Sequence, residues 1–104
     1  MLTIPEKSRQ GFSFIFEDED LQPFLPETVR YRVHDPDTDL ELLPWTSVSP
    51  DTTVMVILPA TINRIVDDSN AYETRVLTVQ SDYDTDDQLS QDRTYRVQNL
   101  SGFQ

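Results

Sequence analysis

Aspartate residues are the side chains with the clearest potential for chemistry, because they recur at alternate positions in two short runs. Alternating carboxylates in a loop can surround a hard cation such as calcium. The two runs consist of Asp35, Asp37, Asp39, Asp82, Asp84 and Asp86. Both runs therefore have to be compared with the spacing that calcium loops require.

The spacing excludes an EF-hand in either run. An EF-hand loop needs glycine at its sixth position and glutamate at its twelfth. The first run has Leu40 and Thr46 at these positions, and the second has Asp87 and Arg93. A weak calcium site that pools carboxylates from several turns stays open. A solvated acidic rim that prevents edge-to-edge pairing of strands is the simpler explanation of both runs.

The residue types needed for catalysis are scarce in this chain. His34 is the only histidine, which leaves no histidine pair for a metal and no HExxH motif. A Ser-His-Asp triad built on His34 stays open, although no Gly-x-Ser-x-Gly sequence is present. The nineteen Asp and Glu residues single out no pair for glycoside hydrolysis. We predict that the chain is not an enzyme and has no catalytic, cofactor-binding or metal-ligating residues.

The charge of the chain argues against two classes of partner. Eight Lys and Arg against nineteen Asp and Glu give a formal net charge of −11, which repels nucleic-acid phosphate and anionic membrane surfaces. The basic residues are scattered among strand-like segments and form no run that could neutralise several phosphates. They include Arg30, Arg32, Arg64, Arg75, Arg93 and Arg96. We expect neither nucleic acid nor a membrane as a partner.

The 104 residues fit one domain, and the absence of cysteine means that packing has to stabilise it. No segment has an apolar run of signal-peptide or membrane-span length. We therefore expect synthesis and retention in a cytoplasm, or release from it by lysis. Residues 1–10 lack periodicity and are predicted to form an arm that is ordered only if it packs on something. Residues 11–104 are predicted to form the domain.

Alternating hydrophobicity predicts six or seven strands in the domain. They are placed at residues 12–16, 28–34, 40–48, 53–58, 72–80 and 93–100. Residues 35–39 are predicted as a turn, 60–66 as one helical turn, and 81–92 as a long exposed hairpin loop. Strand 53–58 is apolar on both faces, which predicts a central strand. The pattern favours an antiparallel β-sandwich, with a small barrel as the alternative.

Aromatic residues are predicted to lie mostly in the core of this sandwich. Trp45 and Tyr72 occupy positions where immunoglobulin-like sandwiches often have a core Trp and a corner Tyr. Phe12, Tyr31 and Tyr95 are likewise expected to be core residues. Val29, Tyr31 and Val33 alternate with polar residues, so they are expected on the buried face of their strand.

Several segments together resemble a known class of protein. They are Phe14-Ile-Phe-Glu-Asp-Glu-Asp, Pro26-Glu-Thr-Val-Arg-Tyr-Arg-Val-His-Asp, Leu43-Pro-Trp-Thr-Ser-Val, Tyr72-Glu-Thr-Arg-Val-Leu-Thr-Val and Thr94-Tyr-Arg-Val-Gln-Asn-Leu. The chain resembles small immunoglobulin-like or fibronectin-III-like proteins encoded among the structural genes of tailed bacteriophages. The resemblance covers most of residues 11–100 and consists of strand patterns rather than a catalytic signature.

This resemblance implies an immunoglobulin-like or fibronectin-III-like sandwich of about seven strands that serves as a virion component. Its role would be capsid decoration, a head-to-tail or tail accessory function, or adaptation of a fibre. The implied partners are other virion proteins, with many copies or a homo-oligomer in the particle. The contact candidates are the arginine-bearing faces and the arm at residues 1–10.

Two other functions stay open. A carbohydrate- or cell-surface-binding module should show exposed aromatic side chains on one face of a sheet, whereas the aromatic residues here are predicted to be core. A calcium-dependent adhesion domain should gain a large increase in melting temperature when calcium is added.

Overall fold

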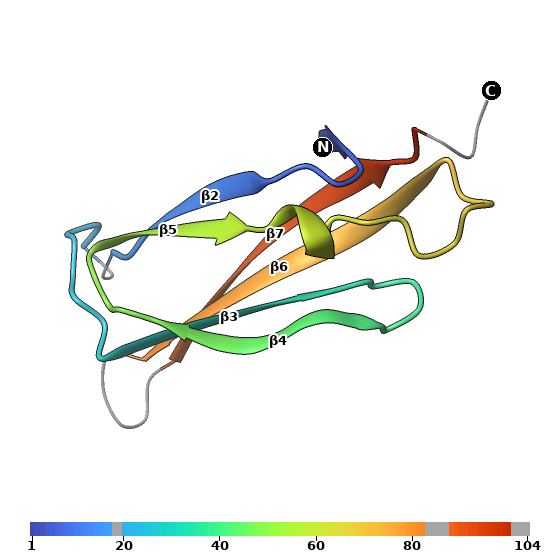
Figure 1. Cartoon of the computed structure of the whole chain (residues 1–104). Helices are drawn as coiled ribbons and strands as arrows, with labels where there is room; N and C mark the ends of the chain where they lie inside the picture. Colours follow the sequence, from blue (N-terminus) through green and yellow to red (C-terminus); the bar gives the residue numbers. More distant parts are fainter. Residues whose placement is uncertain (18–19, 83–87, 101–104) are drawn as a thin grey trace.

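The computed structural model describes residues 1–17, 20–82 and 88–100, and these residues form an all-β protein with seven strands in two sheets (Figure 1). The larger sheet has the order β1-β7-β6-β3-β4, and the smaller one pairs β2 with β5. The strands are β1 (Leu2–Pro5), β2 (Gln10–Ile15), β3 (Thr28–His34), β4 (Glu41–Val48), β5 (Thr53–Leu58), β6 (Tyr72–Asp82) and β7 (Gln88–Gln98). All pairings are antiparallel except β1 with β7, which is parallel.

Side-chain alternation is what fixes these strands, as the sequence predicts. Strand β3 has the predicted bounds, and its residues Val29 and Val33 are buried while Arg30 is exposed. Asp35 ends the strand and accepts hydrogen bonds from the backbone amides of Asp37 and Thr38, at 2.8 and 3.3 Å. This carboxylate stabilises the predicted turn before β4. The helical turn predicted within 60–66 is a short 3₁₀ helix at Ala60–Ile62.

Strand β5 is not a central strand, contrary to the prediction. It pairs only with β2, and its residues Val54, Val56 and Leu58 are buried while Met55 and Ile57 are exposed. The prediction rests on the rule that a strand with two apolar faces is usually covered on both. Here the second apolar face lies on the outside of the smaller sheet.

The prediction of a long loop at residues 81–92 is also wrong, because the strands on both sides extend into this segment. Strand β6 continues to Asp82 and β7 begins at Gln88, so the two strands form an eleven-residue antiparallel pair. The polar residues in this stretch are compatible with strand because one face of the pair is solvated. Asp84 and Asp86 lie outside the described residues. The long pair helps to give the molecule its elongated shape of 50 × 21 × 20 Å.

Part of the N-terminal segment belongs to the larger sheet. Residues 2–5 form β1 along β7, and Ile4 is buried in the core. The lack of periodicity in the sequence reflects the brevity of β1, in which Ile4 is the single buried side chain. The predicted arm therefore does pack on something along these four residues.

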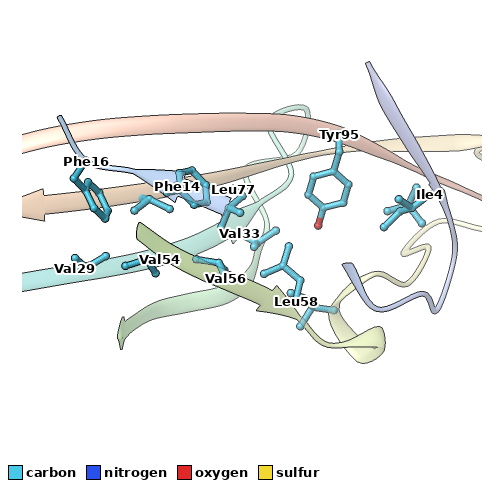
Figure 2. Packing of buried hydrophobic residues seen from close by; sticks show 13 residues of the cluster. Ile4, Phe14, Phe16, Val29, Val33, Val54, Val56, Leu58, Leu77 and Tyr95 are labelled. Atoms are coloured by element: carbon cyan, nitrogen blue, oxygen red, sulfur yellow. The ribbon is translucent and has the colours of Figure 1, made fainter. Parts of the chain in front are cut away.

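The hydrophobic core lies between the two sheets. Figure 2 shows its labelled side chains in a row, from Phe16 and Val29 at one end to Tyr95 and Ile4 at the other. Tyr95 is fully buried, which confirms its prediction as a core residue, and Phe12 and Tyr31 are partly buried against the same cluster.

Trp45 and Tyr72, by contrast, are not core residues. Trp45 is partly exposed and lies outside the core cluster, and Tyr72 retains 45% of its accessible surface. Tyr72 is the first residue of β6, where Glu73 rather than Tyr72 points inward. Trp45 and Tyr72 occupy sequence positions where immunoglobulin-like sandwiches often have core aromatic residues. In this structure, however, both side chains point to the outer face of their strands.

A buried hydrogen-bonded chain joins the core to the N-terminal segment. The Tyr95 hydroxyl donates to Oδ1 of Asn63 at 2.7 Å, and Nδ2 of Asn63 donates to the carbonyl of Ser8 at 2.9 Å. The amide of Lys7 donates to the Asn63 carbonyl at 2.6 Å. Burial raises the pKa of Tyr95, so the hydroxyl remains a donor. Asn63, with no exposed surface, therefore fixes the segment between β1 and β2.

Replacing Tyr95 with phenylalanine is expected to lower the free energy of unfolding by about 1–3 kcal/mol. The substitution leaves Oδ1 of the buried Asn63 without its donor. Urea denaturation should show a lower midpoint with an unchanged m value. Tyr72→Phe is the matched control and should change the stability by less than about 0.5 kcal/mol, because Tyr72 is exposed. Equal effects of the two variants would contradict the role given to Asn63.

Candidate functional site

The outer face of the five-stranded sheet gathers arginine and aromatic side chains. Because Val29 and Val33 of β3 point into the core, Arg30 and Arg32 point to the opposite side. The antiparallel pairing of β3, β6 and β7 gives Arg96 the same orientation. We call the set Arg30, Arg32, Trp45, Tyr72 and Arg96 the arginine face.

Trp45 lies against two of these arginines. The guanidinium carbons of Arg30 and Arg32 are 4.4 and 5.2 Å from the centroid of its ring. Arg30 is also held by Gln80, whose Oε1 accepts hydrogen bonds from Nε at 3.0 Å and from an Nη at 2.6 Å. Contacts of this kind between a cation and a ring contribute about 0.5–1 kcal/mol at exposed sites. The contacts favour the observed position of Trp45 on the surface.

A second arginine-aromatic pair lies on the same face. The guanidinium carbon of Arg96 is 4.3 Å from the centroid of the Tyr72 ring. Nε of Arg96 donates to Oγ1 of Thr3 on β1 at 2.8 Å. Strands β6 and β7 therefore position this pair, and the hydrogen bond from Arg96 to Thr3 links it to β1.

The three arginines of the face have neutral partners. In the part of the chain that the structure describes, the ion pairs found both belong to Arg75, in the interior. Arg30 donates to Gln80 and Arg96 to Thr3, while Nε of Arg32 is buried without a hydrogen-bond partner. The face therefore presents positive charge that no carboxylate of the described residues pairs with.

The interior pairs form a cluster of one cation and two anions. Arg75 has no exposed surface, and its guanidinium donates to Asp35 at 3.1 Å and to Glu73 at 2.7 Å. It also donates to the carbonyls of Thr74 and Arg64, at 2.9 and 3.0 Å. These contacts tie β6 to the turn after β3 and to the loop before β6.

Glu73 is ionised within this cluster. Desolvation alone would raise its pKa, but hydrogen bonds from the amide of Val66, from Arg75, from Asn70 and from the amide of Asp67 outweigh it. They lower the pKa of Glu73 from 4.5 to about 2. The distances to these donors are 2.7–2.9 Å. Glu73 therefore orders the loop before β6 as well as pairing with Arg75.

The described residues that the sequence singled out for metal chemistry, Asp35, Asp37, Asp39 and Asp82, are not brought together as a metal site. Within residues 1–17, 20–82 and 88–100, no group of three or more possible ligands is close enough to hold an ion. Asp35 already contacts two backbone amides and Arg75. His34 ends β3 opposite Glu41 and is partly buried. Asp84 and Asp86 belong to the part of the chain left undescribed.

Two cavities lie away from Trp45. One of about 260 Å³ is on the acidic side of the Arg75 cluster, and its lining residues are Asp35, Asp37, Thr38, Val66, Asp67, Asn70, Tyr72 and Glu73. The other, of about 500 Å³, is open and is lined by Lys7, Ala60, Thr61 and Arg64. Trp45 itself therefore stands on the sheet surface and does not line either hollow.

The smaller sheet carries a different exposed surface. Ile15, Met55 and Ile57 point away from the core and retain 56%, 56% and 44% of their accessible surface. Ser13 pairs with Met55 and Gly11 with Ile57 in the register of β2 with β5, so these residues share one side. We call Ile15, Met55 and Ile57 the apolar stripe. It contains neither charge nor aromatic side chains.

No protein-family model and no curated protein matches the sequence. Among the described residues, no helix has the length and apolar character needed to cross a membrane. The structure defines an all-β domain that consists of a five-stranded sheet and a two-stranded sheet. The larger sheet carries the arginine face.

Proposed function

We propose that the chain is a non-enzymatic binding and assembly domain of the immunoglobulin-like or fibronectin-III-like kind. In keeping with the resemblance described above, we assign it to the virion of a tailed phage. There it would decorate the capsid or serve as a head-to-tail, tail or fibre adaptor. Its partners would be other virion proteins, and it would be present in many copies.

The strand order supports the immunoglobulin-like assignment. Immunoglobulin-like sandwiches pair strands B and E in one sheet and place G, F, C and C′ side by side in the other. When β2 to β7 are lettered B, C, C′, E, F and G in chain order, the observed sheets have this arrangement. Strand β1 along β7 then corresponds to a first strand that has joined the G edge.

The observation that carries the proposed function is the composition of the arginine face. Trp, Tyr and Arg are the residue types that contribute most of the binding energy in protein interfaces. Here Trp45, Tyr72 and three arginines share one open sheet surface, and contacts between them fix their positions. A rigid surface of this kind loses little conformational entropy on binding. This face, rather than residues 1–10, is therefore the proposed contact surface.

The proposal predicts that the protein is found in purified phage particles and that Trp45→Ala lowers its incorporation by about tenfold or more. Met55→Ala on the apolar stripe is the matched control and should incorporate normally. Quantitative mass spectrometry of particles gives both results. Deletion of residues 1–10 is a poorer test, because it removes Ile4 from the core.

Absence of the protein from purified particles would refute the virion assignment. Loss of incorporation by Met55→Ala with normal incorporation of Trp45→Ala would refute the contact surface. Circular dichroism of both variants has to show the parent's fold.

One observation favours a second candidate function, a carbohydrate-binding module. Such a module needs exposed aromatic rings on one sheet face, and Trp45 and Tyr72 lie on such a face instead of in the core. Isothermal titration calorimetry with neutral oligosaccharides distinguishes the two functions. Saturable binding that Trp45→Phe weakens would favour the carbohydrate-binding module.

A further inference from the structure

We propose that the arginine face binds a folded partner protein whose contact surface has an acidic centre flanked by basic residues. This inference rests on the proposed function and adds the chemistry of the partner to it. It follows from the charge pattern along the face.

Along β3 the centre of the face is positive in a chain that is strongly negative, and Asp92 of β7 lies on the same face two strands away from Arg32. The formal net charge is −11, yet Arg30, Arg32 and Arg96 contact neutral groups and rings rather than carboxylates. An acidic surface on a partner would give each guanidinium the charged hydrogen-bond acceptor that it lacks.

The ends of the same face are negative. Asp82 accepts a hydrogen bond from Thr28 at 2.8 Å, at the start of β3, and Glu41 is paired with His34 at its end. The order along β3 is therefore acidic, basic and acidic. A uniformly anionic polymer, such as a nucleic acid or a sulfated glycan, would be repelled at both ends. A partner with the opposite order meets attraction along the length of β3.

The shape of the face favours a protein over a small anion. The two cavities described above are lined without Trp45, Arg30 or Arg32, so neither of them would enclose a small ligand at the centre of the face. Five adjacent strands form a broad surface about 19 Å across at about 4.8 Å per strand. A flat surface with fixed aromatic and arginine side chains fits the centre of a protein interface.

Two peptides of equal composition test the charge pattern. Each is about ten residues long, which spans the roughly 20 Å from Thr28 to His34 in extended form. One has a glutamate centre and lysine ends, and the other has a lysine centre and glutamate ends. Trp45 is the only tryptophan, so its fluorescence reports binding at this face directly. The whole chain is titrated with each peptide at low ionic strength.

The glutamate-centred peptide is expected to bind at least about tenfold more tightly than the lysine-centred one, and added salt should reduce the difference. Arg32→Glu should abolish the preference, and Arg32→Gln should reduce it without introducing a negative charge. Arg9→Glu is the matched control, because Arg9 is exposed and lies outside the face. It should keep the preference.

Equal affinities, or no binding of either peptide at millimolar concentration, would overturn the inference. Tighter binding of heparin than of the glutamate-centred peptide would also overturn it, since a uniform polyanion would then be the better partner. Self-association in sedimentation that Arg32→Glu removes would make a second copy the occupant and likewise overturn it. If Trp45→Ala lowers incorporation while the peptides bind equally, the proposed function stands and the charge pattern alone fails.

Discussion

Replacing Arg75 with methionine is expected to lower the free energy of unfolding by about 3–5 kcal/mol. Methionine fills similar space but leaves Asp35 and Glu73 buried without their cation, and the carbonyl of Arg64 loses its donor. The cost comes from the uncompensated carboxylates more than from the lost attraction. Guanidinium denaturation followed by circular dichroism measures the change.

Arg96→Met is the matched control for this substitution. Arg96 is exposed on the arginine face and donates to Thr3, so its loss should cost less than about 1 kcal/mol. A combined Arg75→Met, Asp35→Asn, Glu73→Gln variant should recover part of the stability lost by Arg75→Met, because it removes the buried negative charges. Similar stability of Arg75→Met and Arg96→Met would contradict the structural role given to the interior cluster.

Acidification is expected to destabilise the fold by up to about 3 kcal/mol through Glu73 alone. Its pKa in the folded state is lowered from 4.5 to about 2, so the folded protein holds Glu73 ionised where the unfolded chain protonates it. The stabilisation is fully present above about pH 5 and is lost as the pH falls towards 2. Unfolding free energies measured between pH 6 and pH 2 should show this decline.

Glu73→Gln should be less stable than the parent at neutral pH and should lose less stability between pH 5 and pH 2. The amide keeps one acceptor for the donors around position 73 but cannot gain or lose a proton. Glu41→Gln, a change at an exposed position of β4, is the control and should leave the decline unchanged. A Glu73→Gln variant with the parent's full acid dependence would contradict the assignment to Glu73.

The sequence predicted strands best where one face is buried and the other is wet. Strand β3 is the clearest case, since Val29 and Val33 alternate with arginines. Prediction failed where local pattern and tertiary environment differ. The apolar outer residues of β5 suggested cover that the sheet does not supply, and the polar residues after Gln80 suggested a loop where β6 continues.

The sequence indicates the arginine-bearing strand faces as contact candidates but misses Trp45 and Tyr72, whose positions suggest core residues. Arg30, Trp45 and Arg96 come from three strands, and only sheet pairing places them on one face. The sequence does indicate which face the arginines of β3 occupy. They alternate with Val29 and Val33, so they lie on the face of the strand opposite to these core residues. The same argument finds Arg75, whose parity matches that of the buried Leu77.

Radical footprinting of the intact particle shows which surface of the protein is covered there, because tryptophan, tyrosine and methionine are readily oxidised. We expect Trp45 and Tyr72 to be protected in the particle relative to the free chain, and Met55 on the apolar stripe to be oxidised equally in both. Protection of Met55 with unchanged oxidation of Trp45 and Tyr72 would contradict the arginine face as the contact surface.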